Sequence, residues 1–177
     1  LFGTANPGDK ATALSSEYLV RPLYENLNAS SAPGELALQH PWEVRPPLMG
    51  AGEAPRRNLM ELLGRSQAQT PALLFTATHG LEYPANHRDQ LHYQGSLLCQ
   101  EWPGPGSEVR RDYFLAAEDL DRHINLLGMI ALFFACYGAG TPELDQFAMQ
   151  AFKVRERIAP RSFTAALPQR MLQRGAL

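Results

Sequence analysis

The sequence predicts an α/β fold built on a mostly parallel β-sheet. Two apolar runs carry this prediction, Leu73–Gly80 (LLFTATHG) and Ile130–Gly140 (IALFFACYGAG). Each has the length of a strand and ends abruptly in small and reactive residues, which is typical of a strand buried in a parallel sheet. Helical patterns alternate with extended segments before the first run, and this alternation indicates parallel strands joined by right-handed crossovers.

Length, charge and composition narrow the class of protein. A chain of 177 residues is ample for one domain and short for two, and 45% hydrophobic residues can form a substantial core. The formal net charge of −2 gives no field that would attract nucleic acid or an anionic membrane, so neither is an expected partner. No apolar run reaches the roughly 18 residues that a membrane span needs.

The cysteines and the two ends of the chain set further expectations. Cys99 and Cys136 lie in no disulfide-rich pattern, which favours a reducing, cytoplasmic setting. Leu1–Thr4 resembles the tail of a strand already under way, and no signal peptide precedes it. Gly175–Leu177 should lead into another strand. We therefore expect a segment of a larger protein, cut at both ends.

In the N-terminal part the pattern predicts a helix, an extended segment and a second helix. Thr12 can cap a helix over roughly Ala13–Leu27, which Pro22 should kink or split. An extended piece within Leu36–Pro47 ends at two consecutive prolines. A helix over Pro55–Leu63 begins at a favourable proline and is ended by a glycine.

In the C-terminal part the elements are shorter. Leu81–Leu91 is polar and irregular, as expected of a loop over the catalytic edge of the sheet. Gln94–Trp102 predicts a short strand, and Phe114–Arg122 predicts a short helix before the second apolar run. Helices are expected again over Pro142–Arg157 and over Ala165–Arg174, the latter capped by a threonine and ended by a glycine.

His79 and Cys136 follow the two predicted strands directly. In an open α/β sheet, ligands bind outside the carboxyl ends of the strands, so residues at these exits can meet although they lie far apart in sequence. Cys136 lies 57 residues after His79, within an A-C-x-G sequence that has Phe134 where a caspase has Gln. A Cys and a His together make a nucleophile and its proton-transfer partner.

Both residues also have a purely structural interpretation. A free Cys is commonly a small buried hydrophobic residue, and a His at the end of a strand can be a hydrogen-bonded cap. Taken together they favour chemistry, because Gly80 follows the His and the Cys lies in a caspase-like sequence.

Three other patterns are weaker. The spacing of His87, His92 and Cys99 fits no zinc site, and no metal or cofactor is expected. Gly3–Lys10 resembles a phosphate-binding loop but lacks Lys directly after its second glycine, which leaves a nucleotide-binding domain as a rival interpretation. The acidic residues of Phe114–Arg122 could line a pocket for a basic side chain, although an acidic surface helix is favoured.

Several of these stretches together resemble a known family. The segments LLFTATHG, QGSLLCQEW, FLAAEDLD and LFFACYGAG, with the helix FTAALPQRMLQRGA, are similar to CHAT domains. These domains are a branch of the caspase-like cysteine peptidases of clan CD and are often found in bacteria beside tetratricopeptide repeats. The similarity spans most of Leu73–Leu177, whereas the N-terminal part fits in topology more than in motif.

The resemblance implies a fold, an activity and a site. The fold would be a three-layer caspase-like sandwich, with residues 1–177 forming a single CHAT domain truncated at both ends. The activity would be that of a cysteine endopeptidase, with His79 and Cys136 as the dyad and the backbone N–H groups of Gly80 and Cys136 as the oxyanion hole. Phe133, Phe134 and Tyr137 depart from the polar residues common near the family's Cys, so the resemblance does not define the pocket for the substrate's P1 side chain.

The expected partners follow from the same resemblance. They are a protein or peptide substrate and a tetratricopeptide-repeat region or other activating partner. The alternative function from another class is a catalytically inactive caspase-like module for interaction or signalling.

Overall fold

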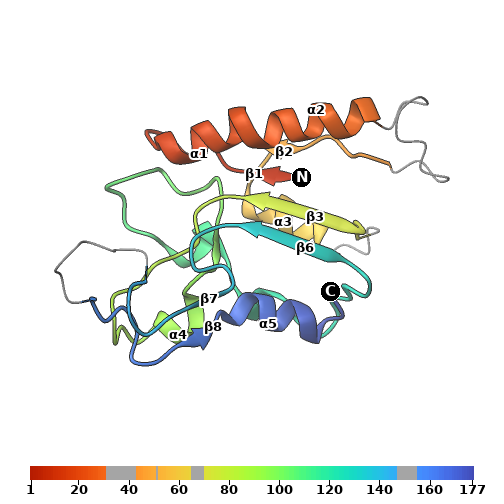
Figure 1. The fold of residues 1–177 in the computed structure, drawn as a ribbon. Coiled ribbons are helices and arrows are strands. Elements are labelled where there is room, and N and C mark those ends of the chain that lie inside the picture. The colour runs from red at the N-terminus through yellow and green to blue at the C-terminus, as the bar shows by residue number, and fades with distance from the viewer. Residues whose placement is uncertain (31–42, 51, 65–69, 147–154) are drawn as a thin grey trace.

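The computed structural model describes residues 1–30, 43–50, 52–64, 70–146 and 155–177 (Figure 1). Its centre is a four-stranded parallel sheet with the order β2-β1-β3-β6. The strands are β2 (Leu48–Met49), β1 (Phe2–Gly3), β3 (Leu73–Ala77) and β6 (Ile130–Phe134). The predicted α/β class with a parallel sheet is therefore confirmed.

The longest pairing joins the two apolar runs. Leu73 of β3 lies opposite Ile130 of β6, and the register continues to Ala77 opposite Phe134. Because residues paired across a parallel ladder point to the same face, alternate residues of both strands share the two faces of the sheet.

The second run is not buried as predicted. The exposed fraction is 50% for Leu132 and 58% for Phe134. Among the described residues no strand pairs with the other edge of β6, so this strand is an edge of the sheet. An apolar run alone cannot distinguish a central strand from an edge strand, because that depends on its neighbours.

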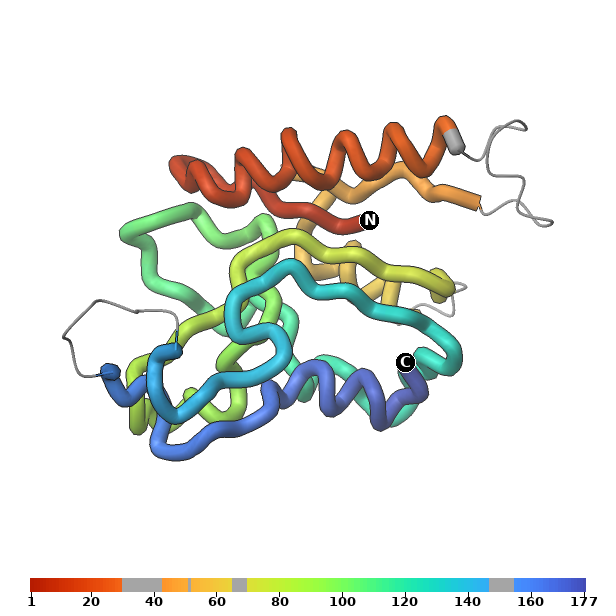
Figure 2. The backbone as a smooth tube through the Cα atoms, in the orientation of Figure 1, coloured from red at the N-terminus to blue at the C-terminus, as the bar shows by residue number. Residues whose placement is uncertain are grey.

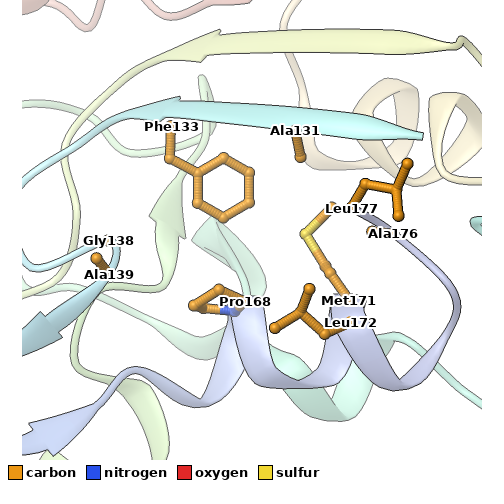
Figure 3. Close-up of a pocket in the computed structure, with 9 residues that line it drawn as sticks. All are labelled: Ala131, Phe133, Gly138, Ala139, Pro168, Met171, Leu172, Ala176 and Leu177. Carbon is orange, nitrogen blue, oxygen red and sulfur yellow. The ribbon is translucent and has the colours of Figure 1, made fainter. Parts of the chain in front are cut away.

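One face of the sheet carries the main core. Phe2 and Leu74 pack there against α3 (Arg56–Leu62) and α5 (Ala166–Gln173), as Figure 1 shows for the two helices. An apolar cavity of about 240 Å³ remains between β6 and α5, and Figure 3 shows Ala131 and Phe133 pointing into it from the strand.

The other face is covered beside β1 by a long N-terminal helical segment. It consists of α1 (Lys10–Ser15), the π-helical η1 (Ser16–Val20) and α2 (Arg21–Ser30), which follow one another as one continuous helical segment (Figure 2). A Cβ atom on Gly3 would lie 2.9 Å from Cγ2 of Val20, so only a glycine permits this close packing.

Two details of this segment differ from the prediction. Asp9 is the N-cap residue, in place of Thr12, and its carboxylate accepts hydrogen bonds from the N–H groups of Ala11 and Thr12. The disturbance expected at Pro22, a kink or a split, takes the form of a π-helical turn between two α-helical segments and not of a break. A proline removes one backbone donor and crowds the preceding turn, and the π-helical turn lies directly before it, where wider spacing accommodates the ring.

The element β2 begins after the two prolines, not before them. Residues 36–42 of the predicted extended piece lie outside the described residues. A proline has no N–H to donate to a ladder, and the first donor is Leu48, whose N–H lies 3.0 Å from the carbonyl oxygen of Leu1. The helix after Pro55 is confirmed as α3 and ends before Gly64, which has a φ of +85°.

The predicted helix over Phe114–Arg122 is wrong. Its start is β5 (Phe114–Leu115), which pairs antiparallel with β4 (Leu97–Leu98), and only a short 3-10 turn, η3 (Ala117–Asp119), follows. The carboxylate of Asp119 accepts hydrogen bonds from the N–H of Ala116 and from two arginines, Arg56 and Arg111. These hydrogen bonds favour the short turn over a regular helix. They cannot be predicted from the local sequence pattern, because Arg56 lies far from Asp119 in sequence.

The remaining elements are short. They are α4 (Gln90–Tyr93), η2 (Arg111–Tyr113), β7 (Gly140–Thr141) and β8 (Phe163–Thr164). The helix expected over Pro142–Arg157 is wrong at both of its described ends, because Asp145 N–H donates to the carbonyl of Glu156 at 2.9 Å as an antiparallel pair does. The last predicted helix is confirmed as α5.

Every helix in the described part of the chain is too short or too polar to cross a lipid bilayer.

The difference in burial between the two faces of the sheet can be tested by replacing one leucine on each face. Leu74→Ala on the core face, where Leu74 is 1% exposed, should lower the free energy of unfolding by about 2–5 kcal/mol because it leaves a cavity. Leu132→Ala on the open face should lower it by about 1 kcal/mol or less. Urea denaturation measures both, and equal losses would contradict the assignment of the faces.

Candidate active site

The exits of β3 and β6 come together at the carboxyl edge of the sheet. Thr78 N–H donates a hydrogen bond to the carbonyl oxygen of Phe134 at 3.2 Å, which continues the pairing of the strands past their ends. His79 and Cys136 then line the same cavity, which has a volume of about 400 Å³. The structure therefore brings the predicted nucleophile and its predicted proton-transfer partner to one site.

Cys136 stands on a tight turn that exposes its thiol. The thiol is free and exposed, and Tyr137 after it has a left-handed φ of +56°. Few residues other than glycine adopt this conformation, and such backbone is often found at functional sites. Gly138 N–H closes the turn on the carbonyl of Ala135 at 3.3 Å.

The side chain of Tyr137 forms a hydrogen bond with the segment that follows His79. Its hydroxyl donates to Oε1 of Glu82 at 3.1 Å. Burial and then the neighbouring Glu82 carboxylate raise the pKa of Tyr137 to about 12, so it remains a neutral donor at physiological pH.

Two glycines permit the close approach of this turn. A Cβ atom on Gly80 would lie 1.7 Å from the carbonyl oxygen of Cys136, and one on Gly95 would lie 2.2 Å from the carbonyl oxygen of Tyr137. Any larger residue at either position would displace the turn. Gly80 was predicted at the site from its place after His79, whereas nothing in the sequence indicated Gly95.

The backbone N–H groups expected to bind an oxyanion, those of Gly80 and Cys136, belong to the two residues that meet in this close approach. Neither the N–H of Gly80 nor that of Cys136 donates a hydrogen bond to any residue that the structure describes. Most backbone N–H groups near a core are paired, so two N–H groups without an acceptor among the described residues are notable beside the Cys136 thiol.

The ring of His79 is held by a carboxylate. Its Nε2 atom lies 2.7 Å from Oδ2 of Asp9, and its ring meets that of Trp102 edge to face with centroids 5.8 Å apart. No hydrogen bond joins the ring to the Cys136 thiol. Because Nε2 is bonded to Asp9, Nδ1 is the ring nitrogen left to exchange a proton.

Asp9 is fixed in turn by the start of α1. Thr12 Oγ1 donates to Oδ2 of Asp9 at 2.6 Å, and the N–H groups of Ala11 and Thr12 also donate to the carboxylate. Burial alone would raise the pKa of Asp9, but the bonds from Thr12 and His79 together outweigh it and lower the pKa. The carboxylate is therefore ionised near neutral pH.

Asp9 is the residue that sequence reasoning missed. The available signal was the pattern Asp-x-x-Thr before a helix, which is typical of an N-cap. The prediction placed the cap at Thr12 instead. The contact between Asp9 and His79 joins residues 70 positions apart in sequence. No local pattern encodes a contact of that range.

The rival patterns do not form sites of their own. Asp9 occupies the N–H groups at the start of α1 and would repel a phosphate, which argues against a nucleotide loop at Gly3–Lys10. Cys99 is fully buried in the core, as predicted, and burial raises the pKa of its thiol. Glu118 and Asp119 pair with Arg111 and do not line an open acidic pocket.

Comparisons with known proteins give no match: the chain matches no family model, no curated protein and no solved structure.

The bond network of Asp9 predicts a pH-dependent stability. Because the folded state lowers the pKa of Asp9 below its ordinary value of 3.8, the stabilisation is present above that pH and is lost as pH falls through the folded-state pKa. Asp9→Asn keeps a capping side chain but removes the charge. It should lower the free energy of unfolding at pH 7 by on the order of 1–2 kcal/mol.

Urea denaturation at pH 7 and at pH 3 measures this effect, and the gap between wild type and Asp9→Asn should narrow at pH 3. Asp112→Asn is the matched control, because Asp112 is exposed and its one ion pair within the described part of the chain is with Arg110 on the surface. A gap that stays constant between the two pH values would contradict the role assigned to the charge.

Proposed function

We propose that this protein is a cysteine endopeptidase that cleaves a protein or peptide substrate through an acyl-enzyme on Cys136. The observation that carries the proposal is the meeting of His79 and Cys136 on one cavity at the carboxyl ends of adjacent parallel strands. A caspase-like sandwich of the CHAT type is part of the same proposal, supported by the parallel sheet with helices on both faces.

The proposed reaction begins with the thiolate of Cys136. A free thiol has a pKa of about 8.5, so a base is needed to take its proton at neutral pH. Nδ1 of His79 accepts this proton. The sulfur then attacks the scissile carbonyl carbon, forming an S–C bond while the carbonyl π electrons move to the oxygen.

The second half of the reaction releases the two products. The tetrahedral intermediate collapses, the C–N bond breaks, and His79 gives its proton to the leaving amine. Water then attacks the thioester with His79 as base, which frees the carboxylate product and restores the thiol. No redox partner or metal takes part in these steps.

The negative oxygen of the intermediate needs donors that are already in place. The N–H groups of Gly80 and Cys136 are suited to this task because both are free of partners among the described residues. Loss of one such donor typically costs about 3–4 kcal/mol of transition-state stabilisation.

Asp9 acts in this proposal as a positioning residue. Its ionised carboxylate accepts the Nε2 proton of His79 and so favours the tautomer with a free Nδ1 lone pair. The same contact stabilises the imidazolium that forms during the reaction.

The ring and the thiol share a cavity without a direct hydrogen bond. Catalytic hydrogen bonds are often long before a substrate binds and tighten in the complex. The proposal therefore includes a dyad that closes on its substrate or on an activating partner, such as the repeat region that the resemblance implies.

A second candidate function is that of a catalytically inactive module for interaction or signalling. The observation that favours it is the open apolar face of β6, where Ile130, Leu132 and Phe134 are all about half exposed. The chemistry of Cys136 distinguishes the two candidates, because an inactive module needs no reactive thiol.

Replacement of the nucleophile tests the proposed activity. Cys136→Ala should abolish cleavage while leaving the fold intact, because Cys136 is free and exposed. Cys99→Ala is the matched control: it should retain cleavage but lose stability, since Cys99 is buried in the core.

Cleavage of a partner substrate and thermal unfolding are measured for both variants. Proteolysis retained by Cys136→Ala would refute the peptidase. Failure of a thiol-reactive peptide to label Cys136 in the wild-type chain under activating conditions would favour the inactive module.

The positioning role of Asp9 predicts a kinetic effect that is separate from stability. Asp9→Asn should lower kcat on the order of 100-fold with little change in KM, because an amide does not select the reactive tautomer of His79. Steady-state kinetics at a temperature where the variant is folded measures this. A rise in KM with unchanged kcat would show that Asp9 serves substrate binding instead.

A further inference from the structure

The cavity beside the dyad has a wall without charge. His79 and Cys136 are the only titratable residues that line it among the described residues. The remaining wall consists of uncharged residues, among them Ala11, Thr12, Ser15, Thr78, Phe134 and Ala135. Its volume of about 400 Å³ can hold one substrate side chain of any size.

The hydroxyl groups of this wall are already engaged. Thr12 donates to Asp9 at 2.6 Å, and Ser15 donates to the carbonyl oxygen of Thr12 at 3.1 Å. The hydroxyl of Thr78 donates to the carbonyl oxygen of Leu98 and accepts from Thr4. The hydroxyl protons are therefore directed into the protein, and the cavity has few polar donors to offer a ligand.

The nearest carboxylates do not alter this character. Asp9 is buried behind the wall, with its side chain 9% exposed, and its Oδ2 atom is hydrogen-bonded to Thr12 and His79. Glu82 accepts a hydrogen bond from the hydroxyl of Tyr137. Neither carboxylate lines the cavity.

We propose that this cavity is the P1 pocket and that it selects an uncharged, apolar P1 side chain, such as that of Leu or Met. The inference rests on the proposed peptidase function and names its substrate class. A charged P1 side chain would lose part of its hydration there without gaining a charged partner on the wall, which is unfavourable. An apolar side chain gains from burial against the Ala11, Phe134 and Ala135 carbons.

Three peptidyl acyloxymethyl ketones that differ only at P1, carrying Leu, Lys or Asp, test the pocket on the wild-type chain. The rate of Cys136 alkylation is measured by intact-mass spectrometry. Alkylation by the Leu compound should be about tenfold faster than by the Lys or Asp compound.

The outcomes separate the pocket from the peptidase. Equal or faster alkylation by the Lys or Asp compound would overturn the apolar pocket but not the proposed peptidase activity. A preference for the Lys compound would point to Glu82 as the carboxylate that binds the P1 side chain. Failure of all three compounds to label Cys136 would overturn both proposals.

A charge placed in the wall should change the preference in a defined direction. Ser15→Asp adds a carboxylate to the cavity and should raise the ratio of Lys to Leu alkylation rates by about tenfold. Ser107→Asp on an exposed loop is the matched control and should leave the ratio at the wild-type value. An unchanged ratio in folded Ser15→Asp would place the P1 side chain outside this cavity.

Discussion

The parallel pairing of β3 with β6 is the constraint on which the site depends. Because the two strands run in the same direction and in register, their exit turns leave the sheet at one level. The hydrogen bond from Thr78 to Phe134 extends this alignment, and the close contact of Gly80 with Cys136 completes it. An imidazole and a thiol far apart in sequence thus reach a common cavity without any local interaction between them.

The start of α1 links the same site to β1, the strand on the other side of β3. Asp9 caps this helix and holds His79 with one carboxylate, so the fold of the N-terminal segment and the orientation of the ring depend on each other. The hydroxyl of Thr12 supports that carboxylate and also closes the cavity wall. The hydroxyl groups of Thr12, Ser15 and Thr78 donate to groups within the protein, which leaves a largely apolar cavity wall beside His79 and Cys136.

Prediction from sequence succeeded where the signal is local. The strand at Leu73, the helix after Pro55 and the exit positions of His79 and Cys136 follow from apolar runs and from helix-start chemistry. Prediction failed where distant residues decide. Asp119 draws its segment away from a helix through bonds to Arg56 and Arg111, and the exposure of β6 depends on which strands lie beside it.

The sequence by itself determined the α/β class and the placement of a His and a Cys after two strands, because periodicity and strand-ending residues are properties of short windows. The tertiary structure alone decided three features: the bond between Asp9 and His79, the fit of the Cys136 turn against Gly80 and Gly95, and the uncharged cavity wall. Each is a contact between segments far apart along the chain, and such contacts are set by the packing of whole elements.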